Sequence, residues 1–315
     1  MKLTLAIPAH NDLTGLCQLL ARTASLGIAE HVVVVDDGSD TPIDKDTLLA
    51  ACRGRPEQLT LLRNDTARGP GVARNHALEH VPTPHMLFMD ADDLPTRELV
   101  HLLQDLDGKV FDFCLFQHHD TRQEREHSWG QMPHEQTLWQ AAGVDLGALN
   151  PVPPDAAVLL SRTANYPWNK IYRTGFLREN GIGCSEIMVH EDVELHWRSF
   201  LNARHILASD RVAAIHFVTE GGARLTNRTG PERLDVFVPL ERIAAEITTR
   251  TKAGETVVYA LPFFRFVIGL LDWISGNLRP EFQPRFETLA QVFLRNHMPA
   301  DMRADIAISD RTNSI

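Results

Sequence analysis

Residues 32–39 read VVVVDDGS, a run of four valines that ends in two carboxylates, a glycine and a serine. An unbroken β-branched run is typical of a parallel strand that is buried on both faces. Shorter apolar runs at 3–7, 59–62 and 86–89 are interpreted as further strands. The intervening helices are expected at 13–20 and 47–52, and after Gly69-Pro70-Gly71. Strands that alternate with helices predict a parallel α/β sheet.

Residues 86–93 read MLFMDADD, an apolar strand that runs directly into three carboxylates. Side chains alternate along an extended chain, so Asp90 and Asp92 point the same way. Two such carboxylates can hold a divalent cation, which can bind a diphosphate, but a solvated acidic turn remains an alternative. Ligands bind outside the carboxyl ends of parallel strands, where 8–11, 36–40 and 90–93 all lie. This coincidence favours a ligand site.

Each of these segments has a plausible chemical role. The Asp37 carboxylate can accept a hydrogen bond from uracil N3–H, although Asp-Gly-Ser is also ordinary turn and helix-cap chemistry. His10 could stack on a base or only satisfy its own loop. Residues 68–75 read RGPGVARN and open a helix with glycines and two arginines, Arg68 and Arg74. Helix N-termini and arginines both favour phosphate, although no Walker loop or dinucleotide fingerprint is present.

Composition narrows the class of protein further. The chain has 315 residues and a formal net charge of −10, with 41 acidic and 31 basic residues. This balance argues against a nucleic-acid partner, and an anionic substrate would need a metal ion or an arginine cluster. Four scattered cysteines fit a reducing compartment. The N-terminal apolar run stops at Pro8, too short for a signal peptide, so a cytoplasmic location is expected.

Five segments together resemble bacterial glycosyltransferase family 2, whose members have the GT-A fold and invert configuration. They are IPAHN at 7–11, VVDDGS at 34–39, GVARN at 71–75, FMDADD at 88–93 and HEDV at 190–193. They follow the family's order and spacing over residues 1–226. The resemblance implies a Rossmann-like mixed, mostly parallel sheet flanked by helices. It divides this domain into a nucleotide-sugar-binding half (1–95) and an acceptor half (96–226), followed by a mainly helical extension (227–315).

The resemblance also implies roles for individual residues on the donor side. It places a nucleotide sugar, taken to be a UDP-sugar, at the carboxyl edge of the sheet. Asp37 is expected on the base and Asp90 on the ribose side. Asp92 is expected to be the main protein ligand of Mg²⁺ or Mn²⁺, with Asp90 as a further ligand. The other residues expected to bind the nucleotide sugar are Pro8, His10, Arg68, Arg74 and Ala91.

On the acceptor side the resemblance makes Asp192 the general base of an inverting displacement. Without it, Glu191 and Asp192 could simply be first-turn carboxylates favoured by the helix dipole. Residues 168–170 read WNK and resemble the acceptor-side core of bacterial members. The alternative is that Trp168 only packs and Lys170 only pairs locally.

Two departures from the family pattern stand out. His10 replaces a frequent tyrosine, and the usual arginine is displaced in the loop after a strand expected at 211–217. His216 could contact the metal or diphosphate, or simply end the strand, and Arg224 could replace the displaced arginine. The neighbouring pair His118-His119 is expected in a surface loop.

Residues 227–315 lie outside the matching segments and read as mainly helical. Residues 261–274 are the most apolar stretch, but they are too short to span a bilayer and contain Arg265 and Asp272. A core helix or a contact between copies in a homo-oligomer is one interpretation. The other is an interfacial helix near a lipid-linked acceptor, with peripheral contact at the inner face of the cell membrane.

Three functions remain under consideration. The first is an inverting glycosyltransferase that makes surface polysaccharide or glycolipid by transfer to a glycan or lipid-linked acceptor. The second is a nucleotidyltransferase, which would want a Gly-rich loop with Lys or Arg where residues 8–11 read PAHN. The third is a non-catalytic nucleotide-sugar-binding protein, against which the presence of Asp90, Asp92 and Asp192 argues.

Overall fold

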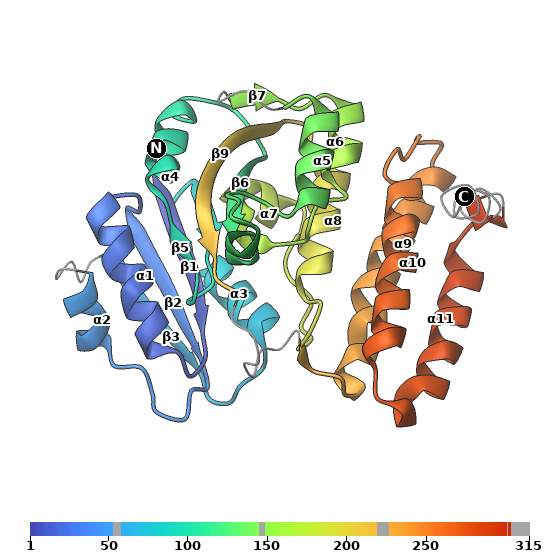
Figure 1. Cartoon of the computed structure of the whole chain (residues 1–315), viewed down its shortest axis with the longest axis horizontal. Coiled ribbons are helices and arrows are strands. Elements are labelled where there is room, and N and C mark those ends of the chain that lie inside the picture. The colour runs from blue at the N-terminus through green and yellow to red at the C-terminus, as the bar shows by residue number, and fades with distance from the viewer. Residues whose placement is uncertain (53–57, 145–148, 219–226, 301, 304–315) are drawn as a thin grey trace.

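The body of the protein is one mixed sheet with helices on both faces, and three long helices stand beside it (Figure 1). The computed structural model describes residues 1–52, 58–144, 149–218, 227–300 and 302–303. The strand order is β3-β2-β1-β4-β8-β6-β9-β5, and β7 pairs with β9. The predicted α/β fold with a C-terminal helical extension is confirmed.

The first half of the sheet is parallel. It contains β1 (Leu3–Ala9), β2 (His31–Asp37), β3 (Leu59–Asn64) and β4 (His85–Phe88), which alternate with α1 (Leu13–Leu26), α2 (Lys45–Ala51) and α3 (Pro70–Glu79). β1 pairs in parallel with β2 and β4, and β2 pairs in parallel with β3. Residues 32–35 are buried, as their sequence predicts. The carboxyl ends of these four strands therefore lie along one edge.

The second half of the sheet adds antiparallel pairs of strands. Few of its helices and strands are predicted by the sequence pattern. It contains β5 (Leu94–Pro95), α4 (Arg97–Asp105), β6 (Phe113–Asp120), η2 (Thr121–Glu126), α5 (Pro133–Ala142), β7 (Leu149–Pro151), α6 (Pro154–Leu160), η3 (Pro167–Asn169), β8 (Lys170–Arg173), α7 (Thr174–Glu179), α8 (Asp192–Asn202) and β9 (Ile206–His216). β8 runs antiparallel to β4 and β6, whereas β6 and β9 are parallel. The strand expected at 211–217 begins earlier, at Ile206.

The expectation of a surface loop at His118-His119 is wrong. Both residues lie in β6, and both are 0% exposed. β6 is buried along its whole length because it lies between β8 and β9. Two adjacent histidines are polar in the sequence, but here burial of the whole strand overrides that signal.

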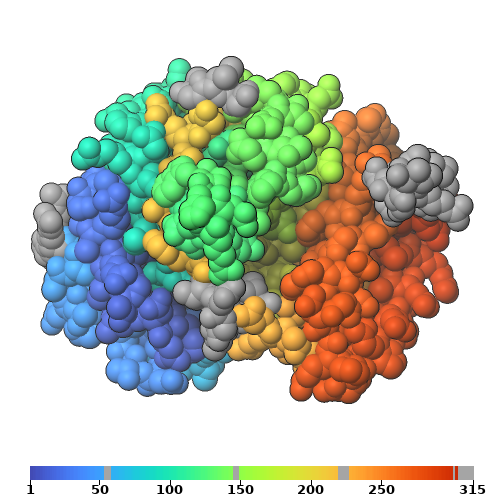
Figure 2. Space-filling model, in the orientation of Figure 1, coloured from blue at the N-terminus to red at the C-terminus, as the bar shows by residue number. Residues whose placement is uncertain are grey.

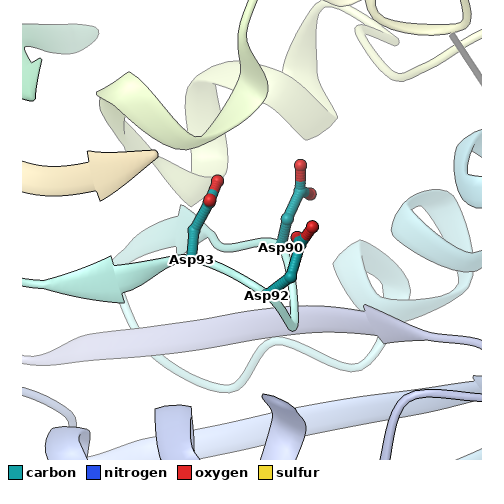
Figure 3. Close-up of side chains that lie close together, drawn as sticks. All are labelled: Asp90, Asp92 and Asp93. Carbon is teal, nitrogen blue, oxygen red and sulfur yellow. The ribbon is translucent and has the colours of Figure 1, made fainter. Parts of the chain in front are cut away.

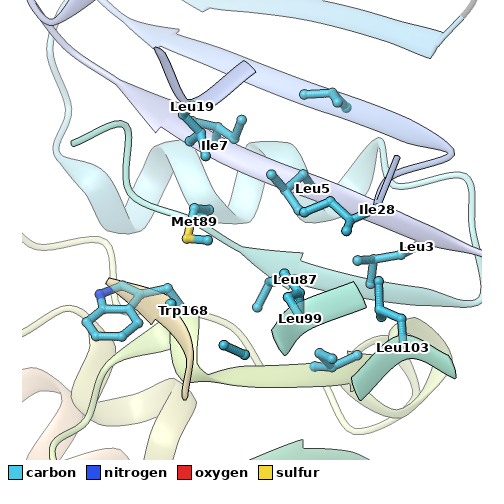
Figure 4. Close-up of a cluster of buried hydrophobic side chains, with 14 of the residues drawn as sticks. Leu3, Leu5, Ile7, Leu19, Ile28, Leu87, Met89, Leu99, Leu103 and Trp168 are labelled. Carbon is cyan, nitrogen blue, oxygen red and sulfur yellow. The ribbon is translucent and has the colours of Figure 1, made fainter. Parts of the chain in front are cut away.

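Two hydrophobic clusters hold the sheet between its helices. One includes α1 and α4 and appears in Figure 4, where Leu5, Ile7 and Leu19 lie together. The other includes α3 and α5 to α8. Each fully buried leucine contributes about 1.5–3 kcal/mol relative to an exposed one. Leu16, Leu19 and Leu20 of α1 are buried in this cluster, whereas Leu13 at the start of the helix is 42% exposed.

The C-terminal helices form a lobe against the body, which Figure 2 shows in orange and red. The lobe contains η5 (Pro231–Val236), α9 (Phe237–Lys252), α10 (Ala260–Asn277), η6 (Pro280–Phe282) and α11 (Gln283–His297). A third hydrophobic cluster joins it to Val193, Trp197 and Leu201 of α8. The apolar stretch at 261–274 is thus a core helix within α10. The predicted domain boundary at residue 226 lies outside the described residues.

None of the helices within the described residues combines the length and the apolar character that a membrane span requires.

Candidate functional site

The loops that follow β1, β2 and β4 meet at the carboxyl edge of the sheet, as predicted. The backbone N–H of Asn11 donates to Ser39 Oγ at 2.9 Å, and that of Asp40 donates to Asn11 Oδ1 at 2.8 Å. The loop after β4 approaches α1 so closely that a Cβ on Gly15 would lie 2.8 Å from the Ala91 carbonyl oxygen. The sheet thereby gathers the three polar segments into one place.

The acidic cluster after β4 has the donor set of a divalent-cation site. Oxygen atoms of Asp90, Asp92 and Asp93 all lie within 4.8 Å of one another, and their side chains extend to one side of the loop (Figure 3). Asp92 is exposed, Asp90 is partly exposed and Asp93 is buried. Carboxylate oxygens are the ligands that hard cations such as Mg²⁺ and Mn²⁺ prefer. The residues present therefore fit such an ion.

Asp93 is paired with His216, which ends β9. The Nδ1 atom of His216 lies 3.0 Å from each carboxylate oxygen of Asp93, and the N–H of Phe217 donates to the same carboxylate. Burial raises the pKa of Asp93 to about 6. Burial alone would lower the pKa of His216, but the Asp93 carboxylate raises it overall. With Nδ1 engaged, Nε2 is the ring nitrogen available to a ligand, the arrangement in which a carboxylate orients a metal-binding histidine.

Arg74 joins the acidic cluster to the segment of the expected base. Its Nη2 donates to Asp90 Oδ1 at 2.7 Å and its Nη1 donates to Glu191 Oε1 at 2.6 Å. The side chain is buried. Burial would lower the pKa of Arg74, but the two carboxylates raise it well above its ordinary value. Arg74 was expected to bind phosphate, and here both of its terminal nitrogens are bonded to carboxylates.

Asp192 is the first residue of α8, at the point where α3 comes very close. A Cβ on Gly71 would lie 2.1 Å from the Ser185 carbonyl oxygen and 2.9 Å from Glu191 Cβ, so only glycine permits this approach. Burial, and then the negative charge of Glu191, raise the pKa of Asp192 to about 7. A carboxyl group with a pKa near neutrality is well matched to accept a proton.

Asp37 has structural partners in addition to its predicted role. Its carboxylate accepts from Asn64 Nδ2 at 2.7 Å, from the N–H of Gly69 at 2.7 Å and from the N–H of Arg68 at 3.1 Å. The turn chemistry weighed as its alternative belongs instead to Asp36, which accepts from the N–H of Ser39. A carboxylate offers about four acceptor positions, so the base contact of Asp37 stays a prediction.

The remaining donor-side residues lie around this edge. His10 is exposed, and its Nδ1 lies 2.9 Å from the carbonyl oxygen of Asp37. Arg68 is exposed and lies 3.7 Å from Glu186. Pro8 is partly buried near the end of β1. Ala91, which lies between Asp90 and Asp92 in the sequence, is buried. All of these positions are compatible with a ligand above the strand ends.

The acceptor-side residues are buried and packed locally. Lys170 Nζ donates to the Tyr166 carbonyl and to Asn169 Oδ1, both at 2.7 Å. Burial lowers the pKa of Lys170 to about 7, although Asp192 opposes the shift. The ring centroid of Trp168 lies 4.5 Å from that of Tyr166 and 5.0 Å from that of His216, and the Tyr166 and His216 centroids are 5.3 Å apart, so the three rings contact one another. Both residues thus make the local contacts that the alternative describes, Trp168 also packs against His216, and their acceptor-side role stays a prediction.

Arg224 lies outside the described residues. No local pattern predicts the Asp93–His216 and Arg74–Glu191 pairs, because each pair joins residues that are more than one hundred positions apart. The spacing of acidic motifs identifies the participants, but only the strand order identifies their partners.

With this site in place, comparison with known proteins gives the class of protein. Residues 4–164 match the family described as Glycosyl transferase family 2, and the chain belongs to that family. It is 26% identical over 254 residues to "Poly(ribitol-phosphate) beta-N-acetylglucosaminyltransferase TarS" of Staphylococcus aureus strain Mu50, covering 78% of this chain and 40% of that protein. It is 34% identical over 95 residues to "Pre-mycofactocin glycosyltransferase" of Mycobacterium tuberculosis, covering 30% of this chain and 18% of that protein. The chain thus spans less than half the length of these relatives.

Solved structures show the same fold. The structure of residues 1–349 of S. aureus TarS with UDP-GlcNAc superposes with a TM-score of 0.72 and 21% identity, covering 96% of this chain and 83% of that one. A mannosyltransferase from Pyrobaculum calidifontis, in complex with GDP-Man and Mn²⁺, gives a TM-score of 0.54 and 15% identity, covering 100% and 81%. Both likenesses confirm the GT-A architecture.

Proposed function

We propose that the protein is an inverting glycosyltransferase that moves a sugar from a nucleotide diphosphate sugar, a UDP-sugar, to a hydroxyl acceptor in surface polysaccharide or glycolipid synthesis. One observation carries the proposal. A single buried guanidinium, Arg74, is bonded both to the acidic cluster and to the segment that holds Asp192. This pair of bonds brings the acidic cluster next to the segment that precedes Asp192, which supports a shared site. Family membership and the UDP-GlcNAc complex of TarS support the proposal.

On the donor side, Asp92 and Asp90 would hold Mg²⁺ or Mn²⁺, with His216 as a further ligand oriented by Asp93. When bound, the ion neutralises charge that develops on the departing diphosphate. Asp37, aided by its exposed neighbour His10, would bind the base. Pro8, Arg68 and Ala91 complete the proposed nucleotide-sugar contacts. Arg74 acts here by fixing the two carboxylates that it bridges.

On the acceptor side, Asp192 would take the proton of the acceptor hydroxyl. The acceptor oxygen bonds to the anomeric carbon from the face opposite the diphosphate, and the bond from that carbon to the diphosphate breaks. The configuration inverts, and the nucleoside diphosphate leaves with the electron pair. General-base catalysis of this kind is worth about 10²–10⁴-fold. The buried Lys170, in its protonated form, would favour the ionised form of Asp192 that accepts the proton.

The proposed place of action is the cytoplasm, with peripheral contact at the inner face of the membrane when the acceptor is lipid-linked. A homo-oligomer through the C-terminal helices belongs to the same proposal. The apolar side chains Trp273 and Val292 of this lobe are 45% and 46% exposed. They offer apolar surface to a membrane or to a second copy of the chain.

The experiment that tests the function is a donor screen with two readouts. Thermal shift would be measured against UDP-, GDP- and CDP-sugars with Mn²⁺ or EDTA, and release of nucleoside diphosphate would be followed in parallel. We expect a Mn²⁺-dependent shift with UDP-sugars and slow release of UDP. A shift without any turnover over a range of glycan acceptors would favour the non-catalytic alternative. Pyrophosphate release from a nucleoside triphosphate would favour the nucleotidyltransferase.

A further inference from the structure

The residue before the proposed base has an unusual backbone conformation. His190 has φ +65°, in the left-handed region that residues other than glycine rarely adopt. It immediately precedes Glu191 and Asp192, the start of α8. Such a conformation persists only where the surroundings enforce it. Neighbouring groups must therefore hold the His190 backbone in this conformation.

Backbone hydrogen bonds within the segment help to hold the His190 backbone in this conformation. The N–H of Ser185 donates to the Glu191 carbonyl at 2.9 Å, and the N–H of Val193 donates to the His190 carbonyl at 3.3 Å. These two bonds surround Asp192 on both sides. They define a short loop at 185–193 whose geometry depends on the turn at His190.

The His190 side chain is held by residues of the C-terminal lobe. Arg233, from η5, places Nη1 3.0 Å from His190 Nε2. A guanidinium can only donate, so Nε2 accepts and the imidazole is neutral. The Trp273 ring of α10 meets the His190 ring edge to face, with 6.0 Å between centroids. Burial and the charge of Arg233 lower the pKa of His190 to about 4, which agrees with the neutral ring.

Arg233 is itself firmly fixed. Its side chain is 1% exposed, and its Nε donates to the Arg228 carbonyl. Its Cζ lies 4.4 Å from the centroid of the Trp273 ring, the geometry of a cation–π contact. A second tie supports the same segment, because Arg242 of α9 donates to Glu194, which accepts from Ser185 Oγ. The lobe and the loop are thus connected through polar contacts of the buried Arg233 and the exposed Arg242 as well as through apolar packing.

We propose that Arg233 and Trp273 form a clamp through which the C-terminal lobe holds His190 in its left-handed conformation and so positions Asp192. The role of Asp192 in this statement rests on the function proposed above. Arg233 acts through His190 and is a positioning residue. The lobe, which lies outside the family's motif segments, thereby becomes part of the catalytic apparatus.

The direct test is hydrogen–deuterium exchange of the 185–193 loop in Arg233→Met, which keeps the aliphatic stem and removes the donor. We expect exchange at Ser185 and Val193 to be about tenfold faster, with the strands of the sheet unchanged. The matched control is Arg250→Met, which removes a lobe arginine bonded to the Leu201 carbonyl at 2.6 Å. The control should leave the loop unchanged.

Two further variants keep the test decisive. Trp273→Leu alters a residue that is 45% exposed, so it should fold even if Arg233→Met does not, and it should also speed exchange of the loop. In a His190→Gly background, where a left-handed backbone carries no penalty, Arg233→Met should add no further change. Native exchange of the loop in both Arg233→Met and Trp273→Leu would overturn the clamp.

A turnover measurement separates the clamp from the proposed function. In Arg233→Met, turnover should fall about tenfold or more, because small misplacements of a catalytic group are costly, while donor affinity stays within about twofold. Loss of loop protection with turnover unchanged would overturn the link between the clamp and Asp192. The exchange arm needs no substrate, so wild-type protein without transferase activity would contradict the function and leave the clamp standing.

Discussion

Arg74 and Glu191 are 117 positions apart in the sequence, and Arg74 Nη1 donates to Glu191 Oε1 at 2.6 Å. The other terminal nitrogen of Arg74 is bonded to Asp90. A side chain from α3 therefore connects the acidic cluster to the loop that carries Asp192. Under the proposed function, binding of the donor and positioning of the base therefore depend on the same buried cation.

Loss of Arg74 should consequently affect both halves of the site. In Arg74→Met, two carboxylates lose their partner, and we expect a loss of about 1–3 kcal/mol in the free energy of unfolding. Both Mn²⁺-dependent UDP affinity and turnover should fall. Arg178→Met is a matched control, because Arg178 donates to the Leu78 carbonyl at 2.7 Å near the other end of α3. A variant with native UDP affinity and turnover would contradict the bridging role.

Asp92 should account for most of the metal dependence of donor binding. Calorimetry should show tighter UDP binding to the wild type with Mn²⁺ than with EDTA. In Asp92→Ala most of this difference should disappear, because the exposed carboxylate of the cluster is the one expected to reach the ion. Glu287→Ala removes an exposed carboxylate on α11 and is the control for the change in net charge. Equal affinity of the wild type with and without Mn²⁺ would refute the metal site.

Asp37 should show two separable effects. Its carboxylate accepts the N–H of Gly69 and the side chain of Asn64, so Asp37→Ala should cost about 1–3 kcal/mol in the free energy of unfolding. If the same carboxylate accepts uracil N3–H, the variant should also lose its preference for UDP over CDP, since cytosine N3 carries no proton. Comparing both affinities with the melting temperature distinguishes the effects. Destabilised protein with an unchanged UDP preference would limit Asp37 to its structural role.

The fold was predictable to the extent that it depends on local pattern. The valine run at 32–35 and the acidic ends of β2 and β4 indicated parallel strands and the edge at which ligands bind. The same reasoning failed at His118 and His119, whose polarity indicated a loop, because burial of β6 depends on neighbours that come later in the chain. Local signals carry information about one element at a time.

The candidate site residues could be proposed from the sequence, but their pairings could not. Asp90 and Asp92 stand out by type and position, whereas Asp192 is a candidate only through the family resemblance. The pairing of Asp93 with His216 depends on β9 running antiparallel to β5, with Leu94 opposite Ile215, which no short motif encodes. The C-terminal contacts of His190 were likewise invisible, because residues 227–315 carry no motif that would connect them to the site.

The raised pKa of Asp192 predicts how turnover depends on pH. Only the ionised carboxylate can accept a proton, so turnover should rise with pH and level off above about 7. The effect on stability has the opposite sign. The folded pKa lies above the ordinary value of 3.8, so this contribution to stability is complete below about 3.8 and is lost as pH rises through about 7. A turnover profile measured at saturating donor and constant Mn²⁺ that is flat from about pH 5.5 to 8 would contradict this assignment.

The proposed role of Asp192 as the general base is tested by the substitution Asp192→Asn. The variant keeps the size of the side chain but cannot accept the proton, so turnover should fall by about 10²-fold or more, while donor affinity stays within a few-fold. Asp155→Asn, which changes a first-turn carboxylate of α6, is the matched control for helix-dipole effects and should lose only about 0.3–1 kcal/mol of stability. Near-native turnover of Asp192→Asn, with a stability loss like that of the control, would contradict the account and direct attention to Glu191.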